Sequence, residues 1–262
     1  MRISIRGLSL ETSRGDVLHE AELEALWRFR LEFMRLKPEV DPAVDRAAFD
    51  AVVRACRSVG VYRDEEGIQG FTVLSDQPTE VLGTRVVLVR STYGFMRARH
   101  RSSPLLPLMY AEAFARVGLA FPRHRMVVTE VWYPLSYLVL AFNEGVWSLG
   151  TPGISSWQRA VLHHAIETFW SDRFDATTGV VRMNTLPPPL VPARGGRFRA
   201  EAQRTLDAYV AENPQWAEGF ALPAAVELGA GTALVVARTV ARRAVRSMRR
   251  GVDEPRIANA TE

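Results

Sequence analysis

The chain has 262 residues, of which 47% are hydrophobic and 24% are charged, and it carries a formal net charge of +4 at pH 7. These values are close to those of ordinary globular proteins and exclude wholesale disorder. The length allows one large domain, or a domain of about 150 residues with an extension. The single cysteine, Cys56, excludes an intramolecular disulfide and a cysteine-based zinc cluster, and it favours a reducing compartment.

The charge and hydropathy patterns bear on location and partners. Of the 33 basic residues only Lys37 is a lysine, and such an excess of arginine is first a feature of genomic composition. A positive net charge also permits attraction to phosphate-bearing ligands or anionic surfaces. The N-terminal run MRISIRGLSLETSRGD lacks the apolar stretch of a signal peptide, and no segment reaches the ~18 apolar residues of a membrane span. We therefore expect a cytoplasmic protein of bacterial type.

The first segments of the chain have strand-like and then helix-like patterns. Apolar residues near every second position from Ile3 to Leu8 predict a strand. Apolar residues at helical spacing predict helices over residues 19–36 and 45–58, the second with Asp45 as its N-cap. Cys56 lies on the apolar face of the second helix, and we expect it in the core.

Three segments rich in β-branched and aromatic residues follow, separated by turn-forming residues, and they predict antiparallel strands. A helix closed by glycine, a strand and a short helix come next. Beyond Gly150 we expect a turn, a helix, a short strand, a proline run and a long C-terminal helix. These predicted elements are strands 59–64, 67–75 and 80–94, helix 104–118, strand 126–133, helix 134–143, helix 156–170, strand 179–185 and helix 222–250.

The order of strand, two helices, three strands, helix, strand and helix resembles the GNAT superfamily of N-acetyltransferases over residues 1–148. The resemblance implies an α/β (α+β) fold with a mixed, mostly antiparallel sheet flanked by helices, in which a splayed pair of parallel strands holds acyl-coenzyme A. It identifies residues 1–150 as the GNAT-like acyltransferase domain of a divergent bacterial member. Residues 151–262 are then expected to form a mainly helical C-terminal extension.

In the GNAT superfamily a loop with two glycines, preceded by Gln or Arg, holds the pyrophosphate of coenzyme A at a helix N-terminus. The matching stretch here is FMRARHRSSPLLPL, in which Arg97 takes the first position but His100 and Ser102 replace the glycines. Residues with a Cβ adopt the required backbone angles reluctantly. The positive charge still suits an anion, so the resemblance places the donor phosphates here; a capped helix behind a solvated basic loop is the alternative. The candidate phosphate-binding residues are Arg97, Arg99, His100, Arg101, Ser102 and Ser103.

The resemblance also directs attention to the strand that ends at Tyr133. The Asn near the end of the family's fifth strand falls on Tyr133, and its Tyr, the general acid toward the leaving thiolate, falls on Leu140. A phenol with a pKa near ~10 suits proton donation to a thiolate, so Tyr133 and Tyr137 are candidate replacements, unless both simply pack as aromatic side chains. Glu130 is the candidate general base, with a salt bridge to an arginine as its alternative.

The sequence therefore predicts an acyltransferase that moves an acyl group from a thioester donor to an unidentified acceptor. The donor would lie along the strand at Leu88, Val89 and Arg90, with its phosphates on the basic loop. Because the glycine motif is degenerate, the donor is either acyl-coenzyme A or an acyl-phosphopantetheine on an acidic acyl carrier protein. The alternative is a non-catalytic GNAT-like module that binds a ligand or a membrane, which the absent family tyrosine favours.

The segment from Leu222 to Arg250 places apolar residues and arginines on opposite arcs and predicts a basic amphipathic helix. This helix would dock an acyl carrier protein, lie on the anionic inner membrane surface, or cover the core with its charged face outward. His163 and His164 are adjacent on a helix and point in different directions, so we predict no metal site. Nucleic-acid binding has only charge in its favour, with no recognised motif.

Overall fold

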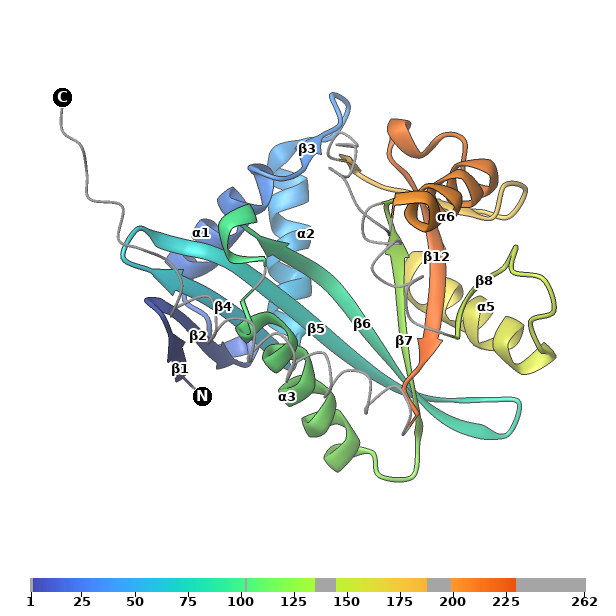
Figure 1. Cartoon of the computed structure of the whole chain (residues 1–262), viewed down its shortest axis with the longest axis horizontal. Helices are drawn as coiled ribbons and strands as arrows, with labels where there is room; N and C mark the ends of the chain where they lie inside the picture. The colour runs from blue at the N-terminus through green and yellow to red at the C-terminus, as the bar shows by residue number, and fades with distance from the viewer. Residues whose placement is uncertain (1, 102, 135–144, 188–198, 230–262) are drawn as a thin grey trace.

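The computed structural model describes residues 2–101, 103–134, 145–187 and 199–229. A long twisted sheet crosses the molecule and helices cover both of its faces (Figure 1). The strands are β1 (Arg2–Ile5), β2 (Leu8–Ser13), β3 (Arg35–Leu36), β4 (Ser58–Asp64), β5 (Gly67–Val81), β6 (Thr84–Met96), β7 (Arg125–Trp132), β8 (Val146–Ser148), β9 (Phe174–Asp175), β10 (Val180–Arg182), β11 (Thr185–Leu186) and β12 (Phe220–Glu227). The α-helices are α1 (Glu20–Leu31), α2 (Pro42–Ala55), α3 (Leu105–Ala120), α5 (Ser156–Trp170) and α6 (Arg199–Glu212).

The main sheet has the order β1-β2-β4-β5-β6-β7-β12-β10-β9, with β8 paired to β12, and a small second sheet joins β3 to β11. Every pair is antiparallel except β6 with β7, which run parallel with α3 as their crossover. The predicted mixed, mostly antiparallel sheet flanked by helices is therefore confirmed. Of the strands after residue 145, β8, β9, β10 and β12 extend the main sheet, and the division of the chain at residue 150 stays a prediction.

Alternation along β6 decides which helices cover which face. Val86 and Leu88 belong to the core beneath α5, whereas Val87 and Val89 belong to the core beneath α3. In β4, Val59 and Val61 pack against α1 and α2, and Gly60, between them, lies against Met109 of α3. Helices α1, α2 and α5 therefore share one face of the sheet, and α3 covers the other.

The parallel pair β6–β7 is short and then opens. Its registered pairs run from Val86 with Arg125 to Arg90 with Thr129. Beyond these pairs β6 continues to Met96 and β7 to Trp132 without facing each other, and Figure 1 shows the two strands diverging in a V. The splayed parallel strands expected from the sequence are thus present.

Several predicted boundaries are wrong for local reasons. The run 80–94 is not one strand, because Leu82 and Gly83 take positive φ and form a two-residue hairpin turn between β5 and β6. The N-cap of α2 is Asp41, whose side chain accepts from Ala43 N, and not Asp45, which is buried inside the helix. Cys56 is in the core as predicted, with 3% of its surface exposed.

The largest correction concerns the segment predicted to begin the C-terminal helix. Residues Phe220–Glu227 form β12, which pairs with β7 along the whole stretch from Leu222 to Glu227. The run ALPAAVEL is apolar enough to be buried on both faces, and periodicity alone does not separate such a strand from a helix. The remainder of the predicted basic helix, residues 230–250, lies outside the described residues.

Candidate functional site

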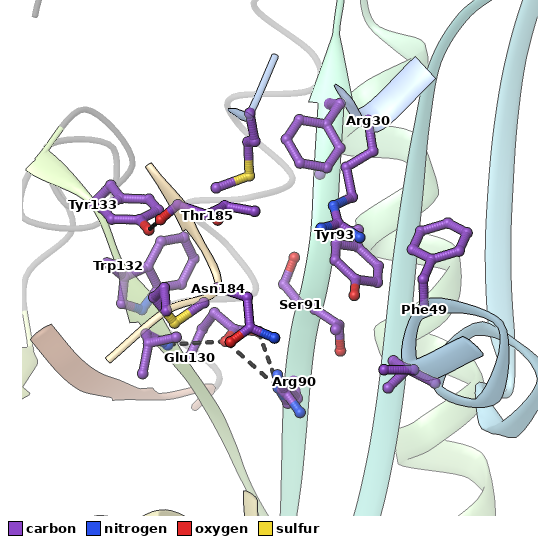
Figure 2. A pocket seen from close by; sticks show the side chains of 18 of the residues that line it. Arg30, Phe49, Arg90, Ser91, Tyr93, Glu130, Trp132, Tyr133, Asn184 and Thr185 are labelled. Atoms are coloured by element: carbon purple, nitrogen blue, oxygen red, sulfur yellow. Dashed lines mark hydrogen bonds and ion pairs between the residues drawn. The ribbon is translucent and has the colours of Figure 1, made fainter. Parts of the chain in front are cut away.

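A cleft of about 550 Å³ occupies the opening between β6 and β7. One wall comes from β6 beyond Arg90, and the other comes from β7 and the residue after it (Figure 2). Helices α1, α2 and α3, the loop after α5 and strand β11 with the residues before it complete the lining. The cleft exists because parallel pairing stops at Arg90 and Thr129, so the side chains and backbone that follow are free to face a ligand.

A β-bulge lies on the β6 wall. Val73 of β5 pairs with Tyr93 and the next residue, Leu74, pairs with Ser91, so that Thr92 is an extra residue in β6. The hydroxyl of Thr92 is buried and has no hydrogen-bond partner among the described residues. Bulges redirect side chains beside binding sites, and here the bulge points unmet polar groups at the cleft.

Glu130 lies on the β7 wall with 5% of its surface exposed. Its Oε1 accepts from the N–H of Val131 at 2.9 Å, and the Nε of Arg90 lies 3.4 Å from Oε2. Oε2 itself is buried and accepts no hydrogen bond from a described residue. The predicted salt bridge to an arginine is therefore present, but it is long and leaves one carboxyl oxygen unsatisfied.

The electrostatic surroundings favour the protonated form of this carboxyl group. Burial raises the pKa of Glu130, and the charge of Arg90, the N–H of Val131 and the charge of Arg173 oppose the shift only in part. A carboxyl group with a raised pKa is a stronger base once it is ionised. The sequence analysis expected a raised pKa here, and the role of Glu130 as a general base stays a prediction.

Arg90 is held in place by aromatic side chains. Its guanidinium lies 5.5 Å from the ring centroid of Phe169 and 5.1 Å from that of Trp170, both on α5. Leu88 and Val89, the other predicted donor-strand residues, are fully buried in the two cores, and their backbones pair with both β5 and β7. Of the three, the structure brings only Arg90 to the cleft.

Tyr133 also lines the cleft, but its hydroxyl is engaged. It donates to the carbonyl oxygen of Thr185 at 2.7 Å, and burial raises its pKa to about 12. Its proton is therefore held more tightly than in a free phenol. Tyr137, the other predicted acid, and Leu140 lie outside the described residues.

A further phenol, which the sequence analysis did not single out, also lines the cleft. Tyr110 of α3 lines the cleft, and its hydroxyl lies 3.0 Å from that of Ser91 on β6. Burial raises the pKa of Tyr110. In the sequence, Tyr110 shows only the helical spacing that is typical of a core residue. Its contact with Ser91 forms when α3 packs on the sheet.

A buried ion pair closes the cleft on the side of α1 and α2. Arg30 donates to Asp45 at 2.9 Å, and the indole N–H of Trp27 donates to the same carboxylate at 3.1 Å. The guanidinium of Arg30 also stacks over the rings of Phe49 and Tyr93. These contacts satisfy Arg30 within the protein and make this wall rigid.

The predicted phosphate loop lies beyond the far end of β6 and contains a short 3₁₀ turn, Ala98–His100. Several backbone N–H groups of this loop bond to carbonyls inside it, namely those of His100, Arg101 and Ser103. These three N–H groups are therefore not directed outward as in the nest of a glycine-rich phosphate loop, as their Cβ-bearing residues would suggest.

The arginines of this loop differ in how fully they are neutralised. Arg97 pairs with Glu32 at 2.7 Å, and Arg99 forms a two-point pair with Glu66, which lowers the pKa of that carboxyl. Arg101 instead donates to the carbonyl of Met96 and has no acidic partner within ion-pair distance among the described residues.

The remaining phosphate-loop candidates are placed as follows. The imidazole of His100 lies 3.2 Å from Asp64, so it too has a carboxylate beside it. Ser103 caps the start of α3, where its Oγ accepts from Leu105 N. Ser102 lies outside the described residues.

No cluster of three or more candidate metal ligands occurs among the described residues. Within the same ranges no helix is long and apolar enough to cross a membrane.

No protein-family model and no curated protein sequence matches the chain. Solved structures are similar to about half of it. The ribosomal-protein-alanine N-acetyltransferase of Brucella melitensis biovar Abortus 2308 is 15% identical and covers 46% of this chain and 79% of its own, with a TM-score of 0.33.

Two further structures are similar to the same extent. The aminoglycoside N-acetyltransferase AAC(6')-Iy in complex with CoA is 16% identical over 54% of this chain and 89% of its own, with a TM-score of 0.37. A protein assigned to the GNAT acetyltransferase family from Desulfovibrio desulfuricans is 12% identical over 54% of this chain and 86% of its own, with a TM-score of 0.36. These are proteins of the type that the element order resembles.

Proposed function

We propose that the chain is an acyltransferase-like protein in which an acyl thioester and an amine acceptor meet in the β6–β7 cleft. The observation that supports this most directly is the buried Oε2 of Glu130 on the cleft wall, which lies 3.4 Å from Arg90 Nε but accepts no hydrogen bond from a described residue. An unsatisfied buried acceptor costs about 1–3 kcal/mol, and an acceptor amine would supply the missing donor. Three other buried polar atoms at the cleft, Thr92 Oγ1, Trp132 Nε1 and Arg173 Nε, also make no hydrogen bond to a described residue.

The proposed reaction assigns one proton to Glu130. The amine nitrogen attacks the thioester carbonyl carbon, the new C–N bond forms, and the C–S bond breaks to release the thiolate. Glu130 takes up the proton that the amine loses. Its raised pKa makes the ionised carboxylate a better proton acceptor, and the nearby charge of Arg90 opposes part of the rise.

The leaving thiolate needs a proton donor in the same cleft. Tyr133, one of the predicted donors, would have to release its bond to Thr185 before its proton is available. The Tyr110–Ser91 hydroxyl pair faces the cleft from the α3 side, next to the bulge at Thr92. We add Tyr110, acting through Ser91, to Tyr133 and Tyr137 as a candidate for this role.

The donor stays either acyl-coenzyme A or an acyl-phosphopantetheine on a carrier protein. A donor phosphate at the basic loop would have to compete with Glu32 for Arg97 and with Glu66 for Arg99. Arg101 has no carboxylate to give up among the described residues, so its loss should weaken binding of the donor phosphate more than the loss of Arg97 or Arg99. We expect Arg101→Ala to weaken coenzyme A binding about 10-fold, as loss of one charge-assisted contact does. Arg99→Ala, the matched control, should change the affinity less.

The first test is thermal unfolding of the pure protein with coenzyme A, acetyl-coenzyme A, a long-chain acyl-coenzyme A and an acyl carrier protein, because a ligand of the folded state raises the midpoint. A rise with an acyl donor, followed by thiol release on addition of an amine, supports acyl transfer. Binding without thiol release across a broad panel of amines would instead support the second candidate, a non-catalytic GNAT-like ligand-binding module. That candidate is favoured by the paired arginines of the loop and by the engaged hydroxyl of Tyr133.

A further inference from the structure

A second cavity, of about 500 Å³, adjoins the cleft. The two share four lining residues, Asp172, Arg173, Met183 and Asn184. The second cavity lies between the small β3–β11 sheet and the end of the main sheet near β9 and β10.

Lys37, the only lysine of the chain, lines this cavity with 7% of its surface exposed. Its ammonium lies 5.2 Å from the ring centroid of Phe220, and its side chain packs so tightly on Gly219 that a Cβ there would lie 3.0 Å from Nζ. No carboxylate of the described residues is within ion-pair distance of this ammonium, whereas Arg182 beside it pairs with Glu39 at 3.0 Å. A buried ammonium without a close counter-ion is costly unless a ligand provides one.

Arg173 is the second cation of the cavity that is poorly satisfied. Its Nε is buried and has no hydrogen-bond partner among the described residues. The nearest carboxylate, that of Asp172, is 3.5 Å away and has 77% of its side chain exposed to solvent, so it screens the charge weakly. Arg173 lines both the cavity and the cleft, and its charge acts on Glu130. It therefore stands where the two spaces join.

We propose that Lys37 and Arg173 bind the carboxylate of the acyl acceptor, and that the acceptor is accordingly an amino acid whose amine faces Glu130. The site would hold a monoanion better than a phosphate dianion, because Glu39, Asp172 and Asp175 line the same cavity and repel added negative charge. The identity of the ligand as acceptor rests on the proposed acyl transfer; the carboxylate site itself does not.

The single lysine gives a direct measurement. Protein labelled with ¹³C at the lysine side chains carries one lysine signal, whose shift against pH reports Lys37 alone. Desolvation first, and then the charge of Arg182, lowers the pKa of Lys37 against the opposing charges of Glu39 and Glu218. A bound carboxylate must raise this pKa, because an opposite charge nearby favours the ammonium.

The probes are glycine, leucine, phenylalanine, glutamate and γ-aminobutyrate, each compared with its carboxamide at millimolar concentration. We expect at least one amino acid to raise the titration midpoint of the Lys37 signal and its carboxamide to leave it unchanged. Lys37→Met and Arg173→Met should each weaken that amino acid about 10- to 100-fold by calorimetry, the loss expected for one charge-assisted hydrogen bond. Arg116→Gln, on α3 and remote from the cavity, should bind it normally. If no amino acid moves the signal, or if each carboxamide acts equally, the inference is wrong.

These outcomes are separate from those for acyl transfer, because binding is measured without a donor. Amino acids that bind at Lys37 but are never acylated would leave the carboxylate site intact and refute the transferase. Acylation that is equally fast for amines with and without a carboxylate would support the transferase and refute this inference.

Discussion

Glu130→Gln separates catalysis from structure at the cleft more sharply than other single changes. The glutamine has the same shape, so its amide oxygen can still accept from Val131 N, but it cannot take up a proton. Loss of a general base usually lowers turnover about 10²- to 10⁴-fold, and we expect a fall in kcat of at least about 100-fold with unchanged donor affinity.

The same substitution should have little effect on the free energy of unfolding. Breaking a tight buried ion pair destabilises a protein by about 3–5 kcal/mol. The contact with Arg90 is long, Oε2 is unsatisfied, and burial already disfavours the charge of Glu130, so the neutral amide removes a cost along with a contact. We therefore expect the free energy of unfolding at neutral pH to change by less than about 1 kcal/mol, or to rise.

The assay couples thiol release from the acyl donor to a chromogenic disulfide reagent, with urea unfolding of both proteins in parallel. Glu227→Gln is the matched control, because Glu227 forms a two-point pair with Arg125 at 2.7 and 2.6 Å, away from the cleft, and its loss should leave kcat unchanged. Wild-type turnover in Glu130→Gln would remove Glu130 from the mechanism. A loss of several kcal/mol in stability would show that the residue is mainly structural.

Four further predictions rest on single features of the structure. The rate of acyl transfer should rise with pH around a midpoint above the ordinary glutamate value of about 4.3, because the pKa of Glu130 is raised; a pH profile of kcat/KM with a midpoint at or below that value would contradict it. Protonated Glu130 should contribute its full stability below the pKa that it has in the unfolded chain. This contribution should be lost as pH rises through the higher pKa of the folded state. Urea unfolding of the wild type and of Glu130→Gln at several pH values measures the difference. Thr92→Val should leave stability within about 1 kcal/mol, since the buried hydroxyl has no described partner, yet weaken ligand binding in the cleft; calorimetry that shows full affinity would exclude Thr92 from the site. Gly15→Ala should destabilise by at least about 2 kcal/mol in urea unfolding, because the new Cβ would overlap the backbone carbonyl of Val53, and a smaller loss would mean that α2 shifts easily.

The sequence predicted local structure well where a single periodicity dominates. The helix over residues 156–170 has the predicted bounds, because Ser155 and Gln158 form a capping box at its start. The prediction fails where a helix and a strand would have the same hydrophobic pattern. The apolar run at residues 220–227 is a strand only because β7 offers a free edge beside it, and a partner strand is a tertiary fact.

The sequence could predict which residue types occur at the candidate site, but not which ion pairs and hydrogen bonds they form. Glu130 was identified because a carboxylate between apolar residues of a strand predicts burial, and the structure buries it at the cleft. The partners of Arg97 and Arg99 were not predictable, since Glu32 and Glu66 come from other elements that folding brings to the loop. Tyr110 was missed because its hydroxyl meets Ser91 only after α3 packs on β6.

The order of elements up to residue 133 and the place of Glu130 in a strand could be predicted from the chain, because they depend on local pattern. The parallel β6–β7 pair was expected from the family resemblance that this order carries. The packing of the folded chain, in contrast, set where β6 and β7 separate and which charges are neutralised. It also decided that Lys37 and Arg173, 136 positions apart in the numbering, line one cavity. Burial and ion pairing depend on distances between segments that are remote along the chain. The periodicity within one segment cannot predict these distances.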